Sequence, residues 1–135
     1  MYEVEVKFPV ADMPALERKL VALAGRFRET VEQVDRYFAH PARDFARTDE
    51  ALRLRRVHEV TKRRLSARVL WQGAEVDVAL DSVANIGDFV ELEIPARQGE
   101  VPLAQACVMS LAKELNCGTP EKRSYLEMVL AARKP

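Results

Sequence analysis

The chain has 135 residues, and its 21 lysines and arginines balance its 21 aspartates and glutamates, so the formal net charge is zero. A neutral chain has no global field that would recruit nucleic acid or an anionic membrane, so any charge-driven binding has to be local. The length fits one domain with a modest core, and residues 1–135 are predicted to form a single domain. No apolar run approaches the length of a membrane span and the N-terminus lacks secretory features, which predicts a cytoplasmic protein.

The first half of the chain is predicted to contain three strands and one helix. Charged and apolar residues alternate in Glu3-Val-Glu5-Val-Lys7, the pattern of a strand. Asp12 is a suitable cap for a helix over residues 13–24. A second strand is expected over residues 33–40, which are rich in residues that favour strands. A third is expected over residues 51–57, where Leu52 and Leu54 alternate with Arg53 and Arg55.

The second half is predicted to contain three strands, over residues 61–70, 75–82 and 88–94, and then two helices, over residues 102–115 and 120–132. Gln72-Gly73 is expected to turn the first two of these strands into a hairpin. Thr119 and Pro120 fit the cap and the first residue of the last helix. Strands in the middle flanked by helices predict an α+β fold, in which an antiparallel sheet curls with helices on its apolar outside and charges on its inside.

Acidic side chains recur at every second position in several of these strands, so each set shares one face of its strand. The candidate metal ligands are five carboxylates: Glu3, Glu5, Asp81, Glu91 and Glu93. Carboxylates that lie close together repel one another unless cations neutralise them. Mg²⁺ and Mn²⁺ prefer carboxylate oxygens and keep waters and phosphates as their remaining ligands, so either ion is the expected cofactor.

Basic side chains lie between the acidic strands in the sequence. The candidate phosphate ligands are Lys7, Arg53, Arg55, Lys62 and Arg64. Arginine can bind phosphate in bidentate fashion. A single charged row is more simply the solvated face of an antiparallel sheet. Acidic rows at both ends with basic rows between them favour a site for a triphosphate and a divalent cation.

Other chemistries have little support in the sequence. Cys107 and Cys117 stand ten positions apart and lack the close spacing of a zinc or redox pair. The five glycines are scattered, so neither a glycine-rich phosphate loop nor a dinucleotide fingerprint is present. No catalytic side chain is assigned.

Several motifs, taken in order along the chain, resemble those of the CYTH superfamily, the triphosphate tunnel metalloenzymes. They are Glu3-Val-Glu5-Val-Lys7, Gln33-Val-Asp35-Arg-Tyr37-Phe38, Ala51-Leu-Arg53-Leu-Arg55, Val60-Thr-Lys62-Arg-Arg64, Val78-Ala-Leu-Asp81, Glu91-Leu-Glu93 and Ser124-Tyr125-Leu126-Glu127. The resemblance extends over nearly the whole chain. Residues 35–55 and 122–127 are most similar to sequences regarded as class IV adenylyl cyclases.

The resemblance implies an antiparallel β-tunnel with flanking helices. It also implies that the five carboxylates hold divalent cations and that the five bases hold a nucleoside or inorganic triphosphate. Class IV adenylyl cyclase, which converts ATP to cyclic AMP and pyrophosphate, is the expected activity. Inorganic tripolyphosphatase and thiamine triphosphatase are the alternatives, and a non-catalytic polyphosphate- or nucleotide-binding module is a third.

One departure from the family pattern lies between Arg56 and Lys62, where Val57-His-Glu-Val-Thr61 joins the flanking strands directly. The family has two further strands and a helix at this point. Either the chain is a short form, or a segment has been omitted and the rest renumbered. A short form should close a hairpin over residues 57–61 and open the tunnel into a trough with two unpaired edges. Unpaired edges favour a homodimer or aggregation.

Overall fold

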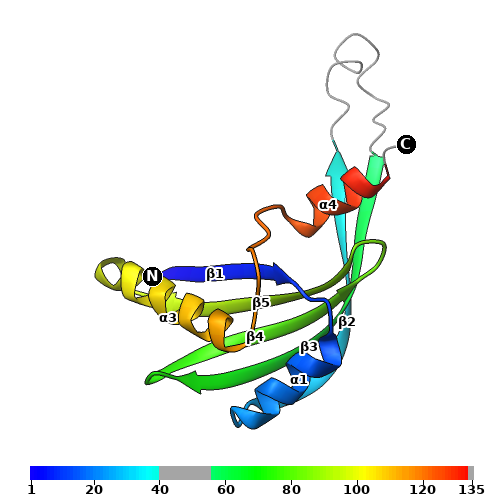
Figure 1. Ribbon diagram of the computed structural model, residues 1–135. Coiled ribbons are helices and arrows are strands. Elements are labelled where there is room, and N and C mark those ends of the chain that lie inside the picture. Colours follow the sequence, from blue (N-terminus) through cyan, green and yellow to red (C-terminus); the bar gives the residue numbers. More distant parts are fainter. Residues whose placement is uncertain (40–55, 134–135) are drawn as a thin grey trace.

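The computed structural model describes residues 1–39 and 56–133 (Figure 1). In chain order these residues form β1 (Tyr2–Pro9), α1 (Met13–Ala22), β2 (Arg26–Ala39), β3 (Arg56–Trp71), β4 (Ala74–Val83), β5 (Gly87–Ala96), the short 3₁₀ helix η1 (Gln98–Glu100), α3 (Val101–Glu114) and α4 (Tyr125–Ala132). No helix in the described part of the chain is both long and apolar enough to cross a membrane.

The strands form one antiparallel sheet in the order β1-β5-β4-β3-β2. The sheet is open, with β1 at one edge and β2 at the other (Figure 1). The predicted α+β class and antiparallel sheet are therefore confirmed, in the opened form of the tunnel.

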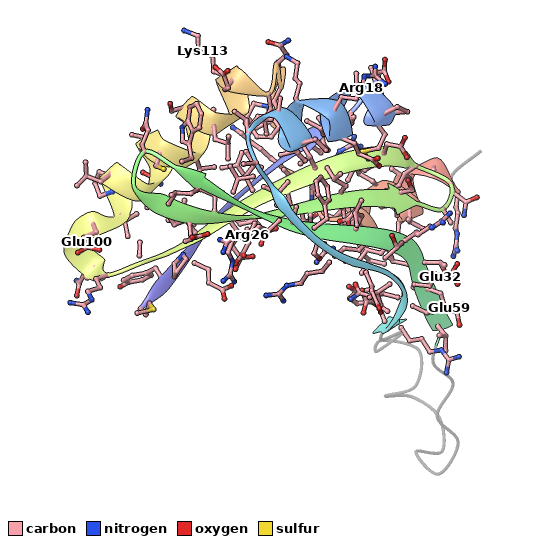
Figure 2. The ribbon with its side chains drawn as sticks, turned by 90° about the horizontal axis from the view of Figure 1, so that it is seen from below. Arg18, Arg26, Glu32, Glu59, Glu100 and Lys113 are labelled. Carbon is pink, nitrogen blue, oxygen red and sulfur yellow. The ribbon has the colours of Figure 1, made fainter. Side chains whose placement is uncertain are left out.

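One face of the sheet is apolar and carries the main core. Val76 and Leu92 are completely buried on this face, and Leu20 of α1 and Leu111 of α3 pack in the same cluster. Figure 2 shows α1 and α3 on the same side of the sheet. Asp12 begins α1 as predicted, because its side chain accepts a 3.1 Å hydrogen bond from the N–H of Ala15. These two helices leave the opposite, charged face open to other contacts.

Strand β3 differs from the expectation. Residues 57–61 were expected to close a hairpin between two strands, but they lie inside β3 and pair with residues 34–38 of β2. The hairpin prediction is wrong because Val57-His-Glu-Val-Thr61 contains no glycine, proline, asparagine or aspartate to turn the chain. The rest of the expected strand over residues 51–57, up to residue 55, lies outside the described residues.

Helix α4 begins later than the expected residue 120. Ser124 is its N-cap: the Ser124 hydroxyl accepts a hydrogen bond from the N–H of Glu127, and the Glu127 carboxylate accepts one from the N–H of Ser124. This reciprocal pair is a capping box. The N–H of Glu121 instead donates a 2.8 Å hydrogen bond to the carbonyl of Lys7, which ties the chain before α4 to β1.

Helix α4 packs on the charged face at one end of the sheet. Tyr125, Met128 and Val129 are buried there against Val60 and Phe89 of the sheet. The two faces of the sheet thus have different partners, α1 and α3 on one side and α4 on the other.

Candidate triphosphate site

The strand register brings the charged motifs together on one face. Glu5 of β1 lies opposite Glu93 of β5, which in turn lies opposite Asp77 of β4. In the next row, Lys7 lies opposite Glu91. Residues that are directly opposite in an antiparallel pair lie on the same face with their side chains adjacent. The predicted acidic and basic rows of β1 and β5 are therefore neighbours.

The acidic row raises the pKa of two of its carboxyl groups. The pKa of Glu5 is raised first by burial and then by repulsion from Glu91 and Glu93. The pKa of Glu93 is raised first by burial and then by the charges of Glu3 and Asp77. The neighbouring carboxylates therefore make Glu5 and Glu93 harder to ionise, as expected where anions gather without a cation.

An ion-pair network lies beside this row. The Nε and Nη2 of Arg64 donate 2.7 Å hydrogen bonds to Oδ1 and Oδ2 of Asp81, and Nη2 also donates a 3.0 Å bond to Oε2 of Glu91. The Asp81 side chain is 0% exposed and that of Arg64 is 24% exposed. The Asp81 hydrogen bond is the largest cause that raises the pKa of Arg64, so the guanidinium stays charged. Arg64 therefore joins the buried Asp81 to the acidic row.

Tyr125 of α4 completes the network. Its phenol donates a 2.7 Å hydrogen bond to Oδ2 of Asp81. The ammonium groups of Lys7 and Lys62 lie 4.5 and 5.3 Å from the centre of the Tyr125 ring, within range of cation–π attraction. Phe89 packs against the same ring, with the two centres 5.3 Å apart. Burial, followed by the hydrogen bond to Asp81, raises the pKa of Tyr125, so the phenol keeps its proton.

A hollow of about 190 Å³ opens next to Arg64 on the charged face. Glu91 and Glu93 line it together with three basic residues, Arg28, Arg64 and Arg68. Arg68 is paired with Asp77 at 2.9 Å. The hollow has both carboxylates and guanidinium groups on its wall, the two kinds of group that a metal–phosphate complex requires.

The structure brings most of the predicted site residues together. The set that meets on the charged face is Glu5, Lys7, Lys62, Arg64, Asp81, Glu91 and Glu93. Glu3 lies at the margin, close enough to raise the pKa of Glu93. Arg53 and Arg55 lie outside the described residues.

Sequence reasoning assigned no site role to Tyr125, Phe89, Arg28 or Arg68. Tyr125 stands in a motif of the family resemblance, which was the one available signal for it. Its contact with Asp81 spans 44 positions, so no local pattern could reveal it.

The carboxylates fit a divalent ion that is held mainly by its phosphate ligand. Among residues 1–39 and 56–133, no three His, Cys, Asp or Glu side chains gather closely enough to form a metal site. Asp81 is already engaged by Arg64 and Tyr125. Glu5, Glu91 and Glu93 nevertheless offer hard oxygen donors on one face, and protein Mg²⁺ sites commonly use only one or two carboxylates plus substrate phosphates. The donor set therefore suits Mg²⁺ or Mn²⁺ in company with a phosphate.

The model of the CYTH domain family matches residues 1–65. No curated protein matches the sequence significantly.

Solved structures share the fold over nearly the whole chain. The PH1819 protein from Pyrococcus horikoshii OT3 is 24% identical with a TM-score of 0.73, and the match covers 98% of this chain and 100% of that one. The PH1012 protein from the same organism is 20% identical with a TM-score of 0.70, covering 93% and 98%. A protein from Vibrio parahaemolyticus, described as a "putative adenylate cyclase", is 15% identical with a TM-score of 0.72, covering 96% and 98%. The family model confirms the resemblance to the CYTH family over residues 1–65, and the solved structures show that the fold is shared over nearly the whole chain.

Proposed function

We propose that the charged face of the sheet binds a triphosphate together with Mg²⁺ or Mn²⁺, and that the protein acts on ATP as a class IV adenylyl cyclase. The observation that carries the proposal is the meeting of Glu5 and Glu91 with Lys7, Lys62 and Arg64 on one face. The CYTH family match supports a protein that acts on triphosphates. We further propose that residues 1–135 form one CYTH domain, acting in the cytoplasm.

The metal ion is assigned to the acidic row. Two of its carboxylates, Glu5 and Glu91, would hold it together with the substrate phosphates, with Glu93 and Glu3 beside them in the row. A bound divalent ion would neutralise phosphate charge and relieve the repulsion that now raises the pKa of Glu5. Asp81, which the resemblance places among the metal ligands, already accepts hydrogen bonds from two protein groups, so we assign it the positioning of Arg64.

The phosphate groups are assigned to the basic side chains beside that row. Lys7 and Lys62 gather at the Tyr125 ring. The hydrogen bonds of Arg64 in the described part of the chain use Nε and Nη2, which leaves Nη1 to donate to a phosphate oxygen. The resemblance adds Arg53 and Arg55 to this set. Cations of this kind stabilise the charge of a transferring phosphoryl group and its leaving group.

The two candidate reactions differ in the atom that attacks. In the cyclase reaction, the ribose 3′-oxygen bonds to the α-phosphorus as the bond to pyrophosphate breaks. In the triphosphatase reaction, water attacks the terminal phosphorus and inorganic phosphate is released. Both need the same anion-binding side chains. The putative cyclase from Vibrio parahaemolyticus, which has the same fold, favours the first reaction.

A product assay tests the proposal. The protein is incubated with Mn²⁺ and either ATP or tripolyphosphate, and the products are separated. Cyclic AMP and pyrophosphate from ATP support the cyclase, whereas inorganic phosphate supports the triphosphatase alternative. Binding without any product would assign the chain to the third alternative, a binding module. The open sheet favours this alternative. Glu91→Gln should lose the activity, and Glu75→Gln, on the exposed end of β4 where Glu75 pairs with Arg26, should keep it.

A further inference from the structure

We propose that two copies of this chain pair along β2, edge to edge, in one specific register. Strand β2 is the last strand of the sheet and has 14 residues. In the described part of the chain its backbone is paired only with β3. A long edge strand presents a row of unpaired N–H and C=O groups, which is a template for another strand.

The far half of β2 has weak support within its own sheet. Residues 34–39 pair with residues 56–61 of β3, and β4 joins β3 only from Lys62 onward. This end of the sheet is therefore a two-stranded ribbon, and such ribbons have marginal stability on their own. Val31 is 50% exposed, Val34 is 53% exposed and Tyr37 is 39% exposed. Apolar side chains thus accompany the unpaired backbone along this edge.

Symmetry limits how a second β2 can pair. Two identical antiparallel strands in one sheet are related by a twofold axis perpendicular to it, so each face of one copy continues the same face of the other. Val31, Gln33, Asp35 and Tyr37 share the charged face, and the residues between them share the opposite face. A register that mixed these two sets would place apolar and polar faces together and is excluded.

One of the remaining registers places complementary side chains of the two copies opposite each other. With the axis at Val34, each Val31 lies opposite Tyr37 of the second copy, and Val34 lies opposite itself. Each Glu32 lies opposite Arg36, which also pairs with Glu59 of its own chain at 3.2 Å, so the arginine would lie between two carboxylates. Opposite charges and apolar pairs directly across a strand pair are stabilising.

Moving the twofold axis by one or two residues along β2 loses these complementary pairs. An axis at Gln33 sets Val31 against Asp35 and Glu32 against Val34. An axis at Asp35 sets that carboxylate against its own copy, and an axis at Glu32 does the same for another carboxylate. Among the axes from Glu32 to Asp35, the pattern of β2 therefore selects the one at Val34, with a second copy of this chain as the partner. Both charged faces would then lie on the same side of one continuous sheet.

Charge reversal tests the register directly. The molar mass in solution is measured by light scattering after size exclusion, from micromolar to millimolar protein. The wild type should show twice the 15.3 kDa mass of the chain. Glu32→Arg and Arg36→Glu should each shift the protein towards the monomer, because each places like charges across the axis. The double variant Glu32→Arg/Arg36→Glu restores opposite charges across the axis and should dimerise again.

Two control variants carry the same charge changes elsewhere. Arg18→Glu on α1 and Glu100→Arg in η1 lie away from the end of β2, as Figure 2 shows. Both should remain dimeric. Circular dichroism of every variant should match the wild type, since the changed side chains are exposed. A wild type that stays monomeric throughout, a dimer that survives both single reversals, or a double variant that stays monomeric while folded would each overturn the proposal.

Discussion

The phenol of Tyr125 donates a 2.7 Å hydrogen bond to Asp81, whose fully buried carboxylate also accepts a hydrogen bond from Arg64 at each of its two oxygens. A buried carboxylate is tolerated only when charged and hydrogen-bonding partners replace its water. Tyr125 comes from α4 and Arg64 from β3, so this carboxylate fastens the last helix to the sheet.

Tyr125→Phe removes only the hydroxyl and keeps the ring for Lys7 and Lys62. The hydrogen bond to a buried charge is then lost, and we expect the free energy of unfolding to fall by about 1–3 kcal/mol. Urea denaturation followed by circular dichroism measures this loss. Tyr2→Phe, at a side chain that is 52% exposed, is the matched control and should change stability very little. Equal stability of both variants and the wild type would show that the phenol contributes nothing to the network.

Asp81→Asn removes the charge that compensates Arg64. Breaking a buried ion pair on one side leaves the other charge poorly solvated, so a loss of about 3 kcal/mol is expected. The control is Asp77→Asn, which breaks the exposed Arg68–Asp77 pair and should cost less than about 1 kcal/mol. The same denaturation experiment compares them. If the two variants lost the same free energy of unfolding, the Asp81 ion pair would contribute no more to stability than an exposed one.

The raised pKa of Glu5 makes the stability of the metal-free protein depend on pH. Well below the ordinary value of 4.5, Glu5 is protonated in both states and has no effect. As the pH rises through the raised folded pKa, the folded state must hold a buried and repelled anion, and stability falls. Glu5→Gln has no such anion. Its melting temperature should therefore equal that of the wild type in acid and exceed it at neutral pH, which differential scanning calorimetry can follow. The idea fails if the difference does not grow with pH.

Metal affinity gives an independent test of the acidic row. Glu5→Gln and Glu91→Gln should each weaken Mn²⁺ binding, because each removes a carboxylate oxygen donor from the proposed site. Isothermal titration with Mn²⁺ measures the affinity, and Glu75→Gln is the control with an unchanged expected value. Unaltered Mn²⁺ affinity in both site variants would show that Glu5 and Glu91 do not bind the metal ion.

Strands β1, β4 and β5 were largely predictable because each has one face against the core. Strand β2 has no buried side chain among its described residues, and only its second half was predicted. Val76, Val78 and Leu80 of β4 are buried, and the residues between them face the charged side, so a period of two was visible in the sequence. The turn at Gln72 and Gly73 was predicted for a similar local reason, since both residues adopt the positive φ angles that a two-residue hairpin loop requires.

Long-range contacts were the part that local patterns could not predict. The start of α4 was misplaced because Thr119-Pro120 is a good helix start, whereas the hydrogen bond between Glu121 and Lys7 holds that stretch outside the helix. The Ser124–Glu127 capping box was the better local signal. The candidate site was predicted strand by strand, but the engagement of Asp81 by Tyr125 depends on how α4 docks on the sheet.

Isothermal titration with tripolyphosphate, with and without Mn²⁺, tests the central claim most directly. The wild type should bind tripolyphosphate, and more tightly with Mn²⁺, because the ion joins the acidic row to the phosphates. Lys62→Gln should lose affinity under both conditions, whereas Lys113→Gln, on the exposed end of α3, should bind as the wild type does. Absence of binding by the wild type under both conditions would contradict the assignment of this face to triphosphate.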